Sequence, residues 1–221
     1  MLSTAYVPAA EAAYIAGLSD RQLQRLFDEN VLVDPFVVNQ NGRFFTRISA
    51  AFAKFYFDLD DDLTASARRF VITQVCRRVL ARSDADDLLA LNFQPAIMDW
   101  DVGFKNFEIK LDAFVTQAQV RTAQIQDAHR LIVQDPDILG GQPVVKGTRL
   151  SVDTLVAMHR SGRSFAQLQL DYPSLTQELL DAAGVYQAIH PRRGRPVKSD
   201  ALPVGWKVRS QKTVRAGNAR V

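Results

Sequence analysis

Residues 13–26 read AYIAGLSDRQLQRL, and this stretch decides the fold of the N-terminal part of the chain. Ala13 is followed after four positions by Gly17 and after six more by Leu23, a spacing that suits two helices packed across a tight turn. Ser19 can cap the second helix, because a serine hydroxyl accepts a hydrogen bond from a backbone N–H at a helix start. The stretch therefore predicts a helix-turn-helix.

The outward face of the second predicted helix is polar. It carries the candidate base-contacting side chains Ser19, Arg21, Gln22, Gln24 and Arg25. Arginine and glutamine can form paired hydrogen bonds to the edges of guanine and adenine in the major groove. This pattern favours operator DNA as a partner; the alternative interpretation is two packed helices with a solvated polar face.

A β-hairpin is expected next, because residues 37–40 and 43–46 flank Asn41-Gly42, a dipeptide typical of two-residue hairpin turns. Arg43 and Arg47 are predicted to lie on this hairpin and to hold DNA phosphates. A helix-turn-helix followed by a hairpin is a winged-helix arrangement, so residues 1–60 are predicted to be a winged helix-turn-helix. In this pattern residues 6–58 resemble the winged-helix domain of MerR-like regulators.

Residues 61–128 are expected to be a helical connector. Thr64 can cap a helix to about residue 82, and a polar helix is predicted to end near residue 126. Between them Phe107, Ile109 and Leu111 alternate with polar residues, which predicts a strand. Because a short apolar strand without a neighbour needs a partner, residues 107–111 are the predicted contact of a homodimer.

Residues 132–153 read IVQDPDILGGQPVVKGTRLSVD, a string that combines two short apolar strands with glycine-rich turns. Three helices are expected after it, to about residue 189. The string closely resembles the domain of unknown function numbered 433, which is found in VapB-like antitoxins. For residues 129–190 the resemblance implies a small hairpin with a three-helix, helix-turn-helix-like fold, and as partner a PIN-like (VapC-like) ribonuclease toxin.

Residues 191–221 are expected to be a basic, extended and flexible tail. From His190 onward the chain holds nine basic residues and one acidic residue, whereas the rest carries a net charge of −5. Under the antitoxin resemblance, arginines of the tail would pair with carboxylates of the nuclease. The predicted toxin-binding residues are Arg192, Arg193, Arg195, Lys198, Val204, Trp206, Val208 and Arg209. Two alternatives stay open: the run RGRP at 193–196 resembles the core of an AT-hook, and a basic tail can simply be solvated.

No group of side chains in the sequence predicts catalysis or a metal site. The three histidines lie far apart, and Cys76 is the only cysteine, which excludes an internal disulfide framework. Neither a signal peptide nor an apolar run of about 20 residues is recognised, so a cytoplasmic protein with no cofactor and no membrane segment is expected.

The chain is therefore expected to be mainly α with small β elements, of the α+β class. The predicted function is that of a type II antitoxin, which neutralises a PIN-like ribonuclease and represses its own operon by binding operator DNA. The alternative is a MerR-like transcriptional regulator without a toxin partner. An enzyme would need an acidic or histidine cluster that the sequence does not supply.

Overall fold

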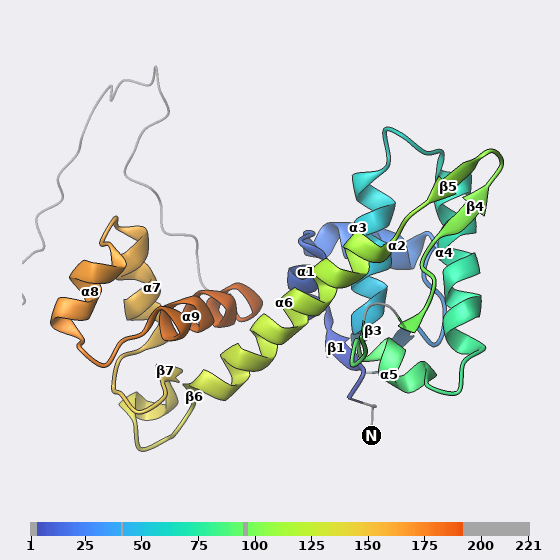
Figure 1. The fold of residues 1–221 in the computed structure, drawn as a ribbon. Helices are drawn as coiled ribbons and strands as arrows, with labels where there is room; N and C mark the ends of the chain where they lie inside the picture. Colours follow the sequence, from blue (N-terminus) through green and yellow to red (C-terminus); the bar gives the residue numbers. More distant parts are fainter. Residues whose placement is uncertain (1–3, 41, 95–96, 192–221) are drawn as a thin grey trace, which may run out of the picture. The chain divides into compact units, whose positions relative to one another are not determined.

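The structure, a computed structural model, describes residues 4–40, 42–94 and 97–191 (Figure 1). This part of the chain is mainly helical with three small antiparallel sheets, which confirms the predicted α+β class. The helices are α1 (Ala9–Ala16), α2 (Asp20–Asp28), α3 (Arg47–Asp58), α4 (Ala65–Leu80), α5 (Ala85–Leu89), α6 (Asp112–Leu131), α7 (Val152–Arg160), α8 (Phe165–Asp171) and α9 (Gln177–Ile189). The strands are β1 (Tyr6–Pro8), β2 (Val37–Asn39), β3 (Arg43–Thr46), β4 (Val102–Phe104), β5 (Phe107–Ile109), β6 (Ile132–Val133) and β7 (Val144–Val145).

Local sequence signals position α1 and α2. Gly17 ends α1 with a φ of 67°, a left-handed conformation that glycine adopts without the steric cost of a side chain. Ser19 then caps α2: its hydroxyl accepts a hydrogen bond from the backbone N–H of Gln22, and the Gln22 side chain accepts one from the backbone N–H of Ser19. The predicted ends of these two helices are therefore confirmed.

The predicted hairpin is present, with one difference. β2 and β3 pair antiparallel with Asn39 opposite Arg43, so residues 40–42 connect them and the predicted two-residue turn is one residue too short. β3 also pairs with β1, Tyr6 opposite Thr46, in a sheet of order β1-β3-β2. β1 was not predicted, because three residues show no period and their partner strand lies far along the chain.

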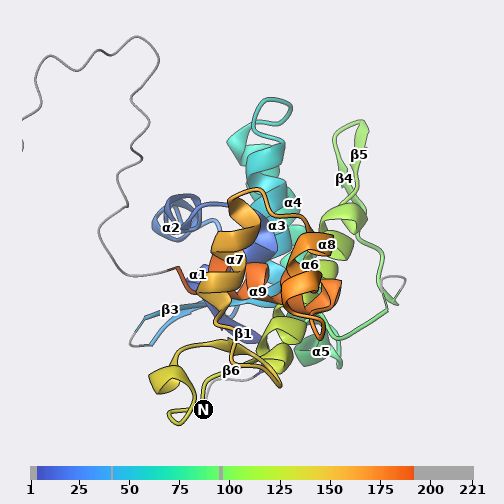
Figure 2. The ribbon, with the colours of Figure 1, turned by 90° about the vertical axis from the view of Figure 1, so that its left-hand side faces the viewer.

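A first hydrophobic core includes residues of α1 to α6 (Figure 2). α1, α3 and α6 pack against one another, and Phe52 and Phe55 of α3 are fully buried among them. α4 adds Val71, Val75 and Val79, whose spacing of four places them on one face of the helix. The regions 1–60 and 61–128 therefore share one core.

The strand predicted near residues 107–111 is β5, and it is not isolated. It pairs with β4, Val102 opposite Ile109 and Phe104 opposite Phe107, in a hairpin whose first strand was not predicted. The prediction that this strand has no neighbour is therefore wrong. That prediction was the reason for expecting a dimer contact here. α6 also continues to Leu131, beyond the predicted end near residue 126.

A second core lies in the C-terminal part of the described chain. β6 and β7 pair, and α7, α8 and α9 pack around Leu155 and Leu168. The three helices lie where the sequence predicts them, and each is capped by a hydroxyl side chain, from Ser151, Ser164 and Thr176. α9 also packs along α6 (Figure 1).

Several predictions fall on residues that the structure does not describe. Asn41 of the predicted hairpin turn is one of them. The predicted tail is another, and with residues 192–221 all the predicted toxin-binding side chains lie outside the described residues. Within the described ranges no helix is long and apolar enough to cross a membrane.

Substitution of Gly17 in the α1–α2 turn is expected to lower the stability of the protein. A Cβ atom there would lie 2.5 Å from Nη1 of Arg121, the atom that donates a hydrogen bond to the Tyr14 carbonyl at 2.8 Å. Gly17→Ala adds left-handed strain of about 1–2 kcal/mol and removes a hydrogen bond that contributes about 0.5–1.5 kcal/mol. Urea denaturation should show an unfolding free energy lowered by roughly 2–3 kcal/mol.

Gly184→Ala is the matched control. Gly184 lies within α9, has no positive φ, and an added Cβ would meet no atom within 4 Å. Because alanine favours a helix interior over glycine, this substitution should raise the unfolding free energy by about 0.5–1 kcal/mol. Equal effects of the two substitutions would contradict a turn that requires glycine at position 17.

Candidate nucleic-acid interface

α2 has a buried face and an open polar face. Leu23 and Leu26 point into the first core and Phe27 packs partly against it, whereas the polar side chains of the helix face outward. The outer face borders a shallow hollow of about 710 Å³ that is completed by the end of α3. The hollow is lined by Ser19, Arg21, Gln22, Gln24, Arg25, Asp28, Glu29, Phe57 and Asp60. The base-contacting residues predicted from the sequence therefore lie together on one surface.

Ser19 and Gln22 hold the start of α2. The Ser19 hydroxyl lies 2.8 Å from Oε1 of Gln22, in addition to the two backbone hydrogen bonds of the cap. Loss of such a cap costs about 0.5–2 kcal/mol. The Ser19 hydroxyl and Oε1 of Gln22 are thus already used at the helix start, where they position α2.

The three candidate base-contacting residues Arg21, Gln24 and Arg25 differ in whether their side chains already have partners. Arg21 is exposed and forms no hydrogen bond or ion pair with the described residues. Nε2 of Gln24 donates to Oδ1 of Asp28 at 2.6 Å, and Nε of Arg25 donates to Oε1 of Glu29 at 2.5 Å. Exposed pairs one helical turn apart contribute about 0.3–0.5 kcal/mol. Gln24 and Arg25 can therefore leave these partners at little cost.

Glu29 is the negative charge at the end of α2. The hydrogen bond from Arg25 is the main cause that lowers the pKa of its carboxyl, and those from Tyr56 and Arg69 add to it against an opposing effect of burial. Arg69 of α4 donates to the Glu29 carbonyl oxygen at 2.9 Å and to Oε2 at 3.1 Å. Arg69 is thus committed to α2 and is not a free cation.

Most of the other arginines of the α4 region are buried or already form hydrogen bonds. Arg68 is buried, and Arg78 and Arg82 donate hydrogen bonds to nearby oxygen atoms. Arg77 is exposed, and its side chain forms no hydrogen bond with the residues that the structure describes. This segment supplies no cluster of free positive charge.

The two arginines predicted for the hairpin lie in different elements. Arg43 is on β3, and its guanidinium lies 5.3 Å from the centre of the Phe27 ring. Arg47 is the first residue of α3, so its predicted place on the hairpin is wrong. Arg47 is also half-buried, and burial lowers the pKa of its guanidinium. Arg43 is therefore the hairpin arginine that remains available to hold a phosphate.

α6 holds the α1–α2 turn from the outside. Arg121 donates to the Tyr14 carbonyl at 2.8 Å, and the Tyr14 hydroxyl donates to Oε1 of Gln124 at 2.9 Å. The Arg121 guanidinium also lies 5.8 Å from the centre of the Tyr14 ring. The sequence analysis did not single out Arg121, because it is 107 positions from its partner and no local pattern connects the two.

The helices α7 and α8 repeat the local design of α1 and α2. Gly162, with a φ of 96°, precedes a capping box in which Ser164 and Gln167 bond reciprocally. The chemistry of the second helix differs, however, since α8 reads FAQLQLD without a basic residue and exposes 83% of Leu170. α2 holds two arginines on its outer face. Of the two surfaces, that of α2 is better suited to nucleic acid.

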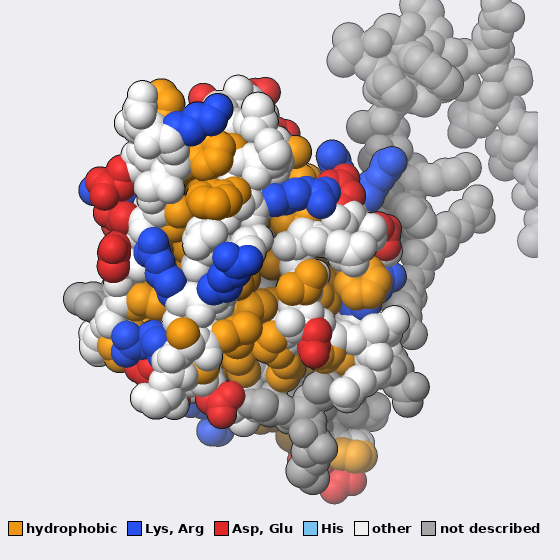
Figure 3. All heavy atoms as spheres, turned by 90° about the vertical axis from the view of Figure 1, so that its right-hand side faces the viewer, with side chains coloured by type: hydrophobic (Ala, Val, Ile, Leu, Met, Phe, Trp, Pro, Cys, Tyr) orange, Lys and Arg blue, Asp and Glu red, His pale blue; other side chains and the backbone are white. Residues whose placement is uncertain are grey.

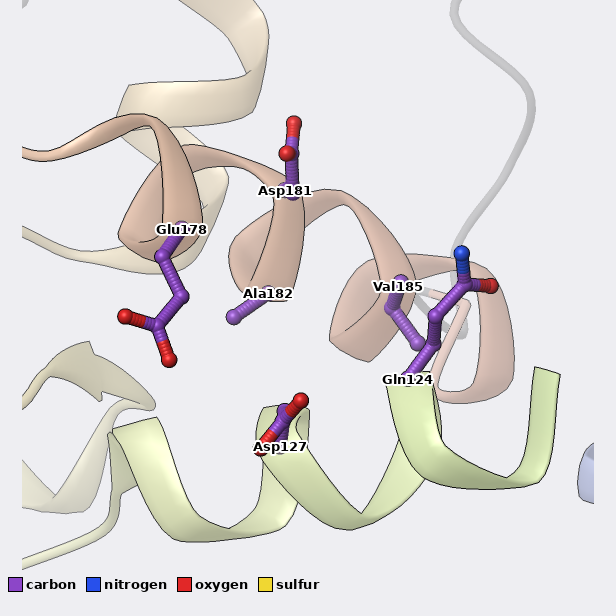
Figure 4. Close-up of a pocket in the computed structure, with 6 residues that line it drawn as sticks. All are labelled: Gln124, Asp127, Glu178, Asp181, Ala182 and Val185. Carbon is purple, nitrogen blue, oxygen red and sulfur yellow. The ribbon is translucent and has the colours of Figure 1, made fainter. Parts of the chain in front are cut away.

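An acid-lined groove lies between α6 and α9 (Figure 4). Asp127 and Glu178 point into it from the two helices, whereas Asp181 points away from α6. Arg130 donates to Asp127 at 3.0 Å and to Glu178 at 2.7 Å, which neutralises part of the charge. Among the residues of known placement there is no group of three or more His, Cys, Asp or Glu that could hold a metal ion.

Comparisons with known proteins identify two relationships. The family model described as "Protein of unknown function (DUF433)" matches residues 132–186. The "Uncharacterized protein y4eO" of Sinorhizobium fredii is 33% identical over 206 residues, which cover 93% of this chain and 91% of that protein. No solved structure matches the chain. The chain therefore belongs to the family of the Sinorhizobium protein y4eO, and it contains a DUF433 domain.

Proposed function

We propose that the protein is a DNA-binding regulator of the antitoxin type, which binds operator DNA upstream of its own gene and neutralises a PIN-like ribonuclease. In this proposal α1 and α2 are a helix-turn-helix of the MerR-like kind, α2 enters the major groove, and the β2–β3 hairpin is the wing. The DUF433 domain and residues 192–221 hold the ribonuclease. A MerR-like regulator without a toxin is the alternative, and it shares the DNA-binding half.

The observation that carries the DNA-binding half is the outer face of α2. The side chain of Arg21 has no partner among the described residues, and that of Gln24 bonds Asp28 one turn along the helix. Arg25 bonds Glu29, and its guanidinium lies 5.9 Å from the ring centre of Phe57 in α3. A paired hydrogen bond to a base edge contributes about 1–3 kcal/mol to discrimination, whereas exposed side-chain pairs add little to stability. Exchange of these partners for base edges is therefore favourable.

The acidic residues beside α2 affect the kind of DNA binding that we expect. Asp28, Glu29 and Asp60 border the same hollow as the arginines, so the surface is not strongly positive. Non-specific DNA binding depends on attraction between basic residues and phosphates. We therefore expect the α2 surface itself to bind DNA through base contacts, with little attraction of its own for unrelated DNA.

The antitoxin half is supported by the DUF433 match, because this domain is associated with toxin–antitoxin-like proteins. The domain has its own hydrophobic core, which is made of residues between Ile132 and Ala183. A partner bound there need not disturb α2. The basic residues beyond position 191 would supply cations for the carboxylates of a nuclease site.

One truncated protein tests both halves. The full chain and a chain without residues 192–221 are each titrated with the DNA upstream of the gene and with the nuclease encoded beside it. We expect the truncated chain to keep operator affinity within about threefold, because the base contacts of α2 are retained. It should lose inhibition of the nuclease, and Trp206→Ala in the full chain should speed dissociation of the complex.

Other outcomes contradict parts of the proposal. Full inhibition by the truncated chain would exclude the tail as the toxin-binding segment. Weaker DNA binding with a smaller salt dependence would indicate an AT-hook instead. If the full chain binds the upstream DNA no better than a shuffled fragment of equal length, the DNA-binding half is wrong.

A further inference from the structure

The β4–β5 hairpin and α4 expose a group of aromatic side chains. Phe107 of β5 has 70% of its surface exposed and Phe70 of α4 has 41% exposed. The rings of Phe70 and Phe104 lie 5.4 Å apart between centres, and Phe104 pairs across the hairpin with Phe107. Figure 3, which shows this side of the molecule, has hydrophobic side chains gathered over it with Lys and Arg among them.

β5 also has a free edge. β4 packs against α4, whereas β5 has β4 as its only strand neighbour in the described part of the chain. Figures 1 and 2 both show the hairpin extending from the helices around the first core. An exposed edge strand offers unpaired N–H and C=O groups to another strand, and a two-stranded hairpin alone is marginally stable.

Charged residues of both signs lie along this edge of β5, so the edges of two copies can be complementary to each other. Glu108 lies in β5 and Lys110 directly follows its last residue, so where the chain is extended the two side chains lie on the same face. Both are exposed, and Nζ of Lys110 also lies 3.7 Å from Oδ2 of Asp101 in its own chain. Together with Lys105, the surface holds equal numbers of these positive and negative charges. A balanced surface gives little attraction for nucleic acid, but it suits a partner with the same alternation of charge.

We propose that this surface binds a second copy of the chain by antiparallel pairing of the two β5 strands about a twofold axis at Ile109. This register sets Glu108 opposite Lys110 of the partner subunit, and the symmetry creates the same pair twice. The exposed Phe107 of each copy is covered in the dimer. The surface lies on other elements than α2, and the pairing does not depend on DNA binding.

Sedimentation velocity of the full chain, without DNA and over a range of concentrations, tests the proposal. Wild type should dimerise, and Phe107→Ser should weaken the dimer roughly 30-fold or more, as loss of a buried aromatic anchor does. Glu108→Lys and Lys110→Glu should each weaken it about 10-fold, because like charges then face each other. The double reversal Glu108→Lys/Lys110→Glu should recover most of the wild-type affinity.

Leu170→Ser is the control, because Leu170 is an exposed apolar residue of α8. It should leave the dimer unchanged. A wild-type chain that stays monomeric, or a Phe107→Ser chain that dimerises like wild type, overturns the proposal. A double reversal no better than the single ones overturns the proposed register. Since no DNA is present, none of these outcomes can be confused with a failure of operator binding.

Discussion

Replacement of Arg21, Gln24 and Arg25 together by alanine should abolish specific binding to the operator. Each lost paired contact to a base edge costs about 1–3 kcal/mol, so three cost about 3–9 kcal/mol. Specific binding of proteins to DNA exceeds non-specific binding by about 4–10 kcal/mol, so the triple variant approaches the non-specific level. A gel-shift titration measures the affinity. The fold should persist, because the lost contacts are side-chain pairs at the surface and none of the three residues is part of the core.

A matched triple variant controls for charge. Arg77, Gln126 and Lys146 are exposed residues outside α2, and their side chains form no hydrogen bond or ion pair with the described residues. Their replacement by alanine removes the same two positive charges and one amide. We expect operator affinity to fall less than about threefold, since no base contact is lost. A loss as large as that of the α2 variant would mean that another surface contacts the DNA.

Leu26→Ala should have the largest effect on stability. Leu26 lies on the inner face of α2 with 0% of its surface exposed, within the first core. Truncation of a buried leucine to alanine costs about 2–5 kcal/mol, through lost burial and the cavity left behind. Since α2 is then no longer held in place, operator affinity should also fall, although Leu26 does not face the DNA. Urea denaturation measures the first effect.

Leu170→Ala is the control for Leu26→Ala, because it makes the same chemical change in α8 at a side chain that is 83% exposed. Surface substitutions of this kind change stability by about 0.5 kcal/mol or less. If the two substitutions destabilise the protein equally, Leu26 is not buried in the core. The packing that turns the polar face of α2 toward solvent would then be contradicted.

Elements with local signals could be predicted from the sequence. Gly17 and Ser19 mark the end of α1 and the start of α2 through their own backbone and side-chain chemistry, which acts within a few residues. The valines of α4 recur at the helical period, and Ser151 caps α7 where the string of residues 132–153 ends. In each case the signal and the structure lie within one or two helical turns.

Elements that depend on distant partners could not be predicted in this way. β1 and β4 are three residues long and exist because β3 and β5 pair with them. The connection in the β2–β3 hairpin is one residue longer than Asn41-Gly42 implies, because Asn39 is the residue that pairs with Arg43. Arg47 was placed on the hairpin because a strand end cannot be located to one residue from an apolar pattern.

The residues of the candidate site divide in the same way, into those that the local sequence indicates and those that depend on distant contacts. The outward position of Arg21, Gln24 and Arg25 follows from the helical period of Leu23 and Leu26. The pairing of Arg25 with Glu29 could also have been found, because residues four apart on a helix are neighbours. The contact of Arg121 with the α1–α2 turn depends on how α6 packs on α1, and nothing near Gly17 in the sequence indicates it.

Directed cleavage of operator DNA tests most directly the central claim that α2 reads the bases. Arg21→Cys is labelled with iron–EDTA; Cys76 is partly buried, and burial raises the pKa of its thiol to about 12, so it should react with the label more slowly. Cleavage of the DNA backbone at a few adjacent nucleotides within the operator is the expected result. Ala166→Cys, an exposed position of α8, should give no specific cleavage. Specific cleavage from position 166 and none from position 21 would contradict the claim and would assign DNA binding to the DUF433 domain.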